Sequence, residues 1–428
     1  MPLDVRRFCV ALATALTVNA GLSIVGAQSL GHPKAVPPKA VTKSETTDET
    51  DEIHALRAKA AAGDVDSQYL LALRYDNGLG VALSSVEAAK WYRKAADQGH
   101  AVAQDSLATM YQLGIGVPKN AVLALDWYLK AAAQGNLNSQ KSLGEIYKKA
   151  NDFVDSFKWY WSAAEQGDPG AQFYLGLAYD EGRGVTRDYA EASNWYKSAA
   201  ELGEASAQFN LALLYENGNG VERDYASAAR WYRKAADNGL IDSFVALGSL
   251  YYNGLGVNQD LSESLVWFRK AADQGNVHGQ FNVGVAYDLG KGVPQDHLEA
   301  LKWYRRAADQ GLASAQYNIA VMYDNGQGVT QDYGEAVKWY RRAVEQGHPA
   351  AQYNLGLSYR DGQGVPQDYV QAHMWLNLAA ARASAKDQQG YATARDSLAK
   401  KMTSDQVAQA QKLAREWLEA YQRRTAQD

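Results

Sequence analysis

The stretch AAQYNLGLSYRDGQGVPQDYVQAHMWLNLAAA, residues 350–381, is one copy of a pattern that fills most of this 428-residue chain. Its tryptophan recurs at seven intervals of 36 residues and one of 32, at Trp91, Trp127, Trp159, Trp195, Trp231, Trp267, Trp303, Trp339 and Trp375. A fixed period of this size indicates one small structural unit repeated nine times. We therefore expect a solenoid, in which each unit contacts mainly its neighbours.

The first half of the copy predicts a helix over residues 350–360. Ala351, Leu355 and Tyr359 lie at i, i+4 and i+8 on one helical stripe. The Leu355 position is aliphatic in every copy, the Tyr359 position is always tyrosine, and the Gly356 position is only glycine or alanine. A small residue there lets a neighbouring helix approach closely.

The second half predicts a turn followed by another helix. Eight copies contain Gly-x-Gly-Val, as in Gly362–Val365, and the first glycine is expected to end the first helix in a left-handed conformation. No Lys-Ser/Thr pair follows, so we interpret these glycines as a structural turn and not a phosphate loop. Ser or Asp with Glu three residues later then predicts a helix start, as at Asp260 and Glu263.

The second helix carries the repeated tryptophan towards the first. Ala372, Trp375 and Ala379 share one face, so the indole is expected to be buried between the two helices. Basic and acidic residues at i and i+4, such as Arg269 and Asp273, predict solvated ion pairs on the opposite face.

The two-helix unit resembles the Sel-one-like repeat, a relative of the tetratricopeptide repeat. The likeness is carried by A-x-x-x-L-G/A-x-x-Y, G-x-G-V and D-Y-x-E-A-x-x-W-Y-x-x-A-A, and covers residues 64–381. It implies an all-α, right-handed α/α superhelix of nine repeats. It also implies adaptor work: family members scaffold membrane-associated complexes, regulate signalling from the bacterial periplasm or meet host proteins. The β-lactamase label of some cysteine-rich relatives does not transfer, because the only cysteine, Cys9, precedes the repeats.

Both ends of the array depart from the pattern. Residues 51–63 resemble a lone second helix and are expected to cap the first repeat. Residues 382–428 leave the period and predict two C-terminal capping helices, which a solenoid needs for solubility.

The N-terminus predicts export. Arg6 and Arg7 precede an uncharged run, and small residues up to Ala27 favour cleavage of a signal peptide over residues 1–27. An uncleaved membrane anchor over residues 8–27, or twin-arginine export, are alternatives. Residues 28–50 have the composition of a disordered linker.

Composition argues against several functions. The net charge of −5 is spread along the chain, which gives no case for nucleic-acid binding. No pair of histidines has metal-ligand spacing, and no nucleophile motif stands out, so we expect no enzyme, no cofactor and no metal.

The third copy offers the first candidate partner site. It lacks four residues of the turn, and Trp161 stands where other copies have Arg or Lys, while the second copy has Leu129 there. These residues, with Phe153, predict an outward apolar patch that anchors a protein partner. The alternative is that the shortened turn tilts the helix and Trp161 fills the gap.

A second candidate is the asparagine that precedes the repeated leucine in four copies. On the inner curve of the solenoid, a ladder of amides could hold an extended peptide. The alternative is an ordinary exposed residue without function. The four residues are Asn210, Asn282, Asn318 and Asn354.

We therefore expect an exported protein–protein interaction scaffold, periplasmic or secreted, that contacts a membrane only if the N-terminal segment stays attached. The alternative is a cell-envelope element that binds glycan or peptidoglycan through its aromatic columns. That alternative requires exposed indole rings, whereas the scaffold requires them to be buried.

Overall fold

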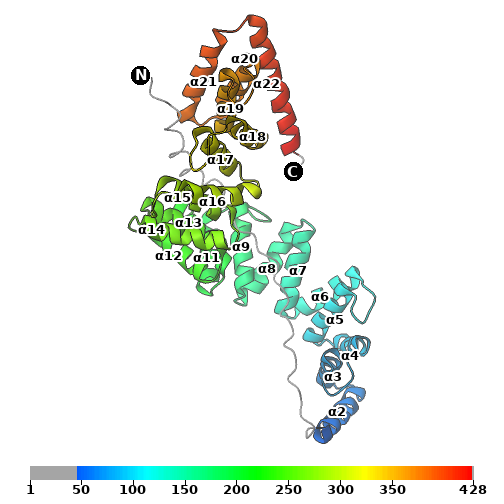
Figure 1. The fold of residues 1–428 in the computed structure, drawn as a ribbon. Helices are drawn as coiled ribbons and strands as arrows, with labels where there is room; N and C mark the ends of the chain where they lie inside the picture. The colour runs from blue at the N-terminus through cyan, green and yellow to red at the C-terminus, as the bar shows by residue number, and fades with distance from the viewer. Residues whose placement is uncertain (1–45, 427–428) are drawn as a thin grey trace. The chain divides into compact units, whose positions relative to one another are not determined.

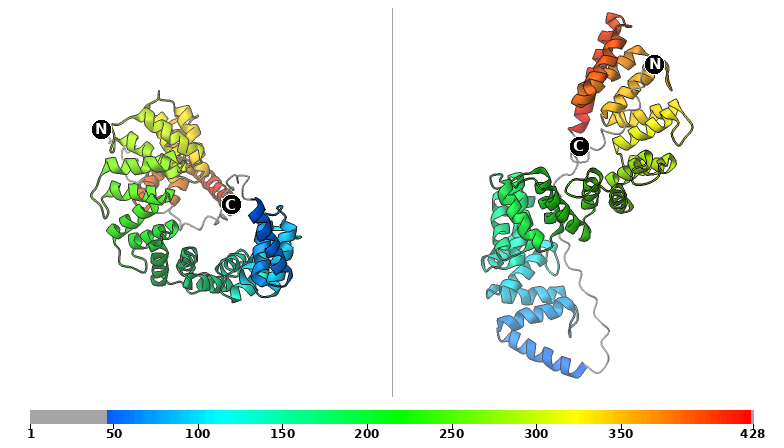
Figure 2. Two further views of the ribbon diagram at one scale, coloured as in Figure 1. Left: turned by 90° about the horizontal axis from the view of Figure 1, so that it is seen from below. Right: turned by 90° about the vertical axis from the view of Figure 1, so that its left-hand side faces the viewer.

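The computed structural model describes residues 46–426, which form helices joined by short turns and contain no strand in that range (Figure 1). Within each of the two units described below, successive repeat helices pack on one another in chain order, so the fold is an all-α solenoid, as predicted. The described residues form two compact units, 46–238 and 239–426. Figure 2 shows the same succession of helices from two other directions.

Each repeat consists of two helices, almost all of 13 residues. The unit of residues 46–238 contains α2 (Thr46–Ala61), α3 (Val65–Asn77), α4 (Ser85–Asp97), α5 (Ala101–Leu113), α6 (Ala121–Ala133), α7 (Leu137–Lys149), α8 (Phe153–Glu165), α9 (Pro169–Glu181), α10 (Tyr189–Glu201), α11 (Ala205–Asn217) and α12 (Tyr225–Asp237). The unit of residues 239–426 contains α13 (Ile241–Asn253), α14 (Leu261–Asp273), α15 (Val277–Leu289), α16 (His297–Asp309), α17 (Ala313–Asn325), α18 (Tyr333–Glu345), α19 (Pro349–Asp361), α20 (Tyr369–Arg382), α21 (Ala385–Ala399) and α22 (Ser404–Thr425).

The ends of the array carry extra helices. α2 packs on α3, and its first turn, from Thr46, lies within the segment predicted to be a linker. At the other end, α21 and α22 both pack against α20. The predicted signal peptide and residues 28–45 lie outside the described residues. Of the helices in the described range, none is both long and apolar enough to cross a membrane.

Helix ends follow the predicted local chemistry. Asp260 accepts hydrogen bonds from the backbone of Ser262 and Glu263 at the start of α14, and Gly254 ends α13 in the left-handed conformation. The second glycine of the turn has another role. A Cβ on Gly292 would lie 2.2 Å from the carbonyl oxygen of Leu261, in the preceding repeat. The Gly-x-Gly pair therefore both ends a helix and lets two repeats touch through their backbones.

The repeated tryptophans are interior, as predicted, but they are not the most deeply buried rings. Trp127, Trp267, Trp303 and Trp339 are buried and the other five are half-buried. The indole of Trp267 lies under the ammonium of Lys270, 3.8 Å from the ring centre. The ring that is fully enclosed belongs to the next residue, as in Tyr196, Tyr232, Tyr304 and Tyr340.

Three arginines of the second helices bond to the next repeat instead of to the carboxylate expected at i+4. Arg269 donates to the hydroxyl of Tyr287 in the next repeat at 2.9 Å, and Arg305 and Arg341 make the same bond to Tyr323 and Tyr359. The guanidinium of Arg269 also lies 5.8 Å from the ring centre of Trp303. A planar cation gains more from a fixed hydroxyl and an aromatic face than from a solvated carboxylate.

Candidate functional site

A hydrogen-bonded chain of side chains crosses the contact between the eighth and ninth repeats. The hydroxyl of Tyr340, on α18, donates to Asp324 on α17 at 3.1 Å and accepts from Asn354 on α19 at 2.9 Å. Burial raises the pKa of Tyr340, so its hydroxyl stays protonated and can donate. We call this acid–tyrosine–asparagine set the junction relay.

The junction relay corrects the prediction of an exposed asparagine ladder. Asn210, Asn282 and Asn318 are buried, and Asn354 is half-buried. Asn210 donates to Tyr196 at 3.3 Å, the same bond that Asn354 makes to Tyr340. These positions face the second helix of the preceding repeat and not solvent. A buried amide needs hydrogen-bond partners, and the tyrosine hydroxyl supplies one.

Four repeats lack the acidic member of the junction relay. The second and ninth repeats have Gln112 and Arg360 at this place, and the other two also differ at a second position. The third repeat has Lys148 at this place, and the sixth has Tyr252. The same two repeats have serine, Ser156 and Ser264, where the other copies have alanine. Each serine hydroxyl donates to a carbonyl oxygen of the first helix, Gly144 at 2.8 Å and Gly248 at 2.7 Å. A pocket lies at each of these two places.

The third-repeat pocket is a cavity of about 220 Å³ between α7, α8 and α9. The turn before it is short, because α7 ends at Lys149 and α8 begins at Phe153. Asn151 takes the left-handed conformation, with φ of 60°, that glycine takes elsewhere. The lining residues are Lys148, Phe153, Ser156, Phe157, Tyr160, Tyr174, Leu175, Leu177, Ala178, Glu181 and Arg183.

Lys148 links one wall of the third-repeat pocket to the other. Its ammonium lies 2.5 Å from Glu145 and 4.3 Å from the ring centre of Tyr174. Burial opposes ionisation of Glu145, but the bond to Lys148, the charges of Lys148 and Lys149 and the bond from Tyr160 together outweigh burial and keep the pKa of the carboxyl below its usual value. Glu145 also accepts from the hydroxyl of Tyr160 at 3.2 Å. The carboxylate that completes the junction relay thus comes from one turn earlier on α7.

Arg183 stands at another part of the lining. Its side chain pairs with Glu181 at 2.7 Å and lies 5.5 Å from the ring centre of Phe153. Both cations of the pocket are therefore already paired, and aromatic rings dominate the rest of its surface. Such a surface favours an apolar or aromatic occupant over a free anion.

The predicted apolar patch is only partly assembled. Phe153 lines the third-repeat pocket, and the ring of Trp161 lies 5.8 Å from that of Phe157, which also lines it. Trp161 is 36% exposed and packs edge-on against Trp195 at 5.2 Å. Leu129 is half-buried, packs against the core of the first repeats and does not line the pocket.

The packing of Trp161 agrees with the gap-filling alternative, while its role as a partner anchor stays a prediction. The ring of Trp161 fills the place that arginine takes at other junctions, and part of the ring stays accessible. Sequence reasoning missed Phe157 and Tyr174. The sequence did contain a sign of both residues. No other copy has Phe, Tyr or Trp at the position of Phe157, and no other copy has an aromatic residue at the position of Tyr174.

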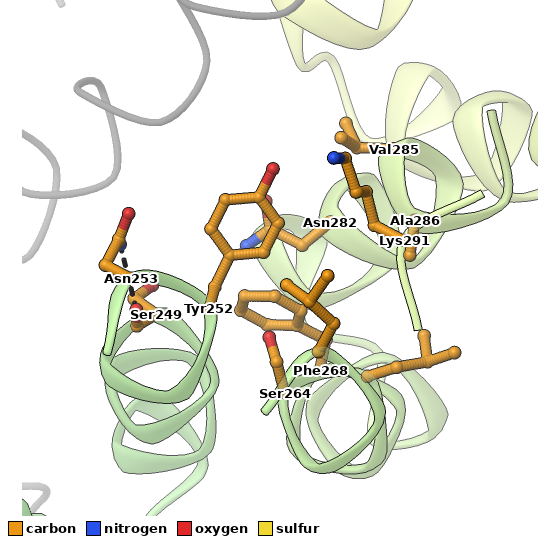
Figure 3. A pocket seen from close by; sticks show the side chains of 11 residues that line it. Ser249, Tyr252, Asn253, Ser264, Phe268, Asn282, Val285, Ala286 and Lys291 are labelled. Carbon is orange, nitrogen blue, oxygen red and sulfur yellow. Dashed lines mark hydrogen bonds between the residues drawn. The ribbon is translucent and has the colours of Figure 1, made fainter. Parts of the chain in front are cut away.

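The sixth-repeat pocket is smaller, about 40 Å³, and lies between α13, α14 and α15 (Figure 3). The second helix has Phe268 in place of the relay tyrosine, so the junction relay has lost both its acid and its hydroxyl. Asn282 lines the pocket, is 9% exposed, and its amide nitrogen has no hydrogen-bond partner. Lys291, from the turn after α15, stands at the edge.

Neither pocket is lined by a set of side chains that could hold a metal ion. Within residues 46–426, no group of three His, Cys, Asp or Glu side chains could hold a metal ion. His100 and His348, the histidines that share a repeat position, each cap a helix through Nδ1.

Comparison with known proteins identifies the family of the repeats. The model of the Sel1 repeat family matches more than half of the chain, at residues 65–100, 101–136, 142–168, 169–204, 205–240, 245–276, 277–312, 313–348 and 349–384. The chain is 34% identical to c5321, a protective antigen present in uropathogenic Escherichia coli strains that displays an SLR fold, over 86% of this chain and 95% of that one, with a TM-score of 0.49.

A second solved structure is a Sel1 repeat protein from Oxalobacter formigenes. It is 32% identical, with 56% of this chain and 96% of that chain covered and a TM-score of 0.52. No curated protein matches the chain.

Proposed function

Because the chain belongs to the Sel1 repeat family, whose members generally mediate protein–protein interactions and are typically non-catalytic, we propose that it is an exported scaffold that holds a protein partner at the third-repeat pocket. The observation that carries the proposal is the cavity beside Phe157, with the partly exposed ring of Trp161 next to it.

The size and lining of the pocket support an anchoring role. Its volume of about 220 Å³ is below the roughly 300–1,000 Å³ typical of sites that enclose small ligands. It suits a single large side chain of a partner. Tryptophan, tyrosine and arginine, which the pocket and its edge contain, are the residues most often responsible for binding energy at interfaces.

Export is proposed from the first 27 residues, which have the charge and apolar run of a signal peptide. A role as adaptor in envelope signalling or in contact with host proteins belongs to the same proposal. The alternative of glycan binding requires open indole rings. The nine repeated tryptophans are buried or half-buried, which supports the scaffold over the glycan-binding element.

Site-specific crosslinking tests the proposal. A photoreactive residue replaces Val154, which is 54% exposed beside Phe153, and a matched control replaces Val122 on α6, which is 77% exposed. We expect a discrete crosslinked protein from position 154 in the envelope fraction and none from position 122. N-terminal sequencing of the recovered chain tests cleavage after Ala27.

A Trp161→Ala variant then separates binding from folding. We expect the crosslink at position 154 to fall at least tenfold while the melting midpoint changes by only a few degrees. If the crosslinked product persists and only the midpoint falls, Trp161 is a packing residue and the proposed anchor site is wrong.

A further inference from the structure

The sixth-repeat pocket contains a buried amide group that forms no hydrogen bond through its nitrogen. The amide nitrogen of Asn282 is buried and has no partner, although Asn354, at the same repeat position, donates to Tyr340 at 2.9 Å. The preceding second helix has Phe268 in place of tyrosine, so the hydroxyl that accepts from Asn354 has no counterpart beside Asn282. The amide nitrogen of Asn318 is also unpaired although Tyr304 precedes it, but only at Asn282 is the acceptor itself missing. A buried donor without an acceptor is unfavourable, because it has lost its bonds to water without replacing them.

The loss of the hydroxyl is matched by a second change. Asp288 and Asp324 accept from the relay tyrosine in the two repeats that follow, but the sixth repeat has Tyr252 there. The first change removes a hydroxyl, and the second replaces a carboxylate with the phenol of Tyr252, which lines the pocket. In Figure 3, Tyr252, Asn282 and Phe268 lie around the resulting space, with Lys291 at its edge.

The remaining polar groups define the charge of a fitting ligand. The hydroxyl of Ser264 is already donated to Gly248, and that of Ser249 to Val245. No Asp or Glu lines the pocket, and Lys291 is its one charged lining residue. The site therefore presents an amide donor and an ammonium with no carboxylate to balance them, which favours an anionic oxygen acceptor.

We propose that the sixth-repeat pocket binds the carboxylate of an Asp or Glu side chain of the protein partner. The carboxylate accepts from the amide of Asn282 and pairs with Lys291. The inference rests on the proposed scaffold function and names the chemistry of a second contact of that partner.

The volume supports a side-chain tip over a whole metabolite. A cavity of about 40 Å³ holds on the order of three water molecules, since one needs roughly 10–15 Å³ by this measure. A carboxyl group is of this size. Because Lys291 is exposed, the pair is expected to weaken as salt concentration rises.

The experiment titrates the isotopically labelled full chain with two probes, N-acetyl-glutamate N-methylamide and N-acetyl-glutamine N-methylamide. The readout is the side-chain amide resonance of Asn282, with that of Asn354, which is bonded to Tyr340, as the internal control. We expect the glutamate probe to shift Asn282 but not Asn354, with an apparent affinity at least tenfold above that of the glutamine probe. Equal responses to both probes, or no response at 50 mM, would overturn the proposal, the second outcome meaning that water satisfies the amide.

Two variants keep this test independent of misfolding. Lys291→Gln is expected to lower the affinity for the glutamate probe several-fold and to remove its salt dependence. The double variant Phe268→Tyr/Tyr252→Asp rebuilds the junction relay, and we expect it to keep or raise the melting midpoint while the glutamate response disappears. A relay-rebuilt chain that binds as well as the original would contradict the proposal. Because the probes report on Asn282 directly, their result does not depend on whether position 154 crosslinks a partner.

Discussion

At the scale of the residue, the repeated tryptophan and the tyrosine that follows it occupy different places in the core of a repeat. The tyrosine after the tryptophan fills the space against the first helix, where a small residue makes room. A Cβ on Gly284 would lie 2.6 Å from the ring of Tyr304. The tryptophan closes the outer side of this core and carries a cation on its face, as Lys270 does on Trp267. Neither ring can be replaced by the other, because one position is enclosed and the other is at its edge.

Trp267 is the clearest case for testing this division, since it is only 3% exposed. Trp267→Ala is expected to lower the free energy of unfolding by about 3–5 kcal/mol, as truncation of a buried indole leaves a cavity. Urea denaturation followed by circular dichroism measures the change. Trp161→Ala is the matched control, and it should cost clearly less because its ring is partly exposed. Equal losses for both variants would show that burial does not set their contributions.

His348 predicts a dependence of stability on pH. Its Nδ1 accepts from Ala351 at the start of α19 and its ring stacks on Tyr317 at 4.8 Å. Burial lowers the pKa of His348 from about 6.5 to about 4. Between these values the unfolded chain takes up a proton that the folded chain resists, so stability falls as pH falls from 6.5 towards 4.

We expect this group to contribute about 1–3 kcal/mol of the loss. His348→Asn keeps a capping side chain, as Asn276 does at α15, and removes the titrating group. The variant should therefore lose part of the decline in denaturation midpoint between pH 6.5 and 4.5. His100→Asn, at the same repeat position, reports the effect of changing the cap alone. A His348→Asn profile parallel to that of the original chain would contradict the assignment.

At the scale of the element, the turn does more than reverse the chain. The first glycine ends the helix, and the second brings the turn against the backbone of the preceding repeat. The third repeat loses both glycines with its four missing residues, and a pocket lined by aromatic rings lies there. The repeat that lacks the second glycine, which elsewhere lets the turn touch the preceding repeat, is thus also the repeat that contains this pocket.

Gly292→Ala tests the contact between repeats. Its φ of 75° is left-handed, and the new Cβ would lie 2.2 Å from the carbonyl oxygen of Leu261. We expect a loss of at least about 2 kcal/mol, because conformational strain and overlap add. Gly390→Ala is the control, since its Cβ would meet nothing within 4 Å inside α21. Thermal melting should show a fall for the first variant and a slight rise for the second, since alanine favours helix over glycine.

At the scale of the whole molecule, the last repeat needs a cover for its outer apolar face. Met374 and Leu378 of α20 are buried against Ala410 and Ala414 of α22. Trp375 packs edge-on against Trp417 at 5.7 Å. The C-terminal helices thus cover apolar surface that the next repeat would otherwise cover.

A chain ending after Ser384 is expected to expose that surface and to self-associate. Size-exclusion chromatography should show species larger than a monomer, and the melting midpoint should fall. The full chain with Leu413→Glu serves as a milder comparison, because the same surface is then disturbed without deletion. A truncated chain that stays monomeric with an unchanged midpoint would mean that α21 and α22 are not caps.

The sequence by itself determined the repeat length, the two-helix unit, the glycine turns and the caps at Asp260 and its equivalents. It also determined which leucine and tryptophan positions face inward. These features depend on residues within about one helix of each other, where periodicity and capping act locally. The sequence also showed that the third copy is four residues shorter, and this departure led to the prediction of Phe153 and Trp161 as site residues.

Only the tertiary structure decided which polar side chains become partners across repeats. Asn210 meets Tyr196, 14 residues earlier, and Arg269 meets Tyr287, 18 residues later. Both pairs depend on how one helix hairpin is rotated against the next, which no local pattern encodes. The burial of the asparagines, the unpaired amide of Asn282 and the position of Leu129 away from the third-repeat pocket follow from that packing. Whether a polar residue has a hydrogen-bond partner depends on which side chain of the neighbouring repeat lies opposite it. That is decided by how the two repeats pack.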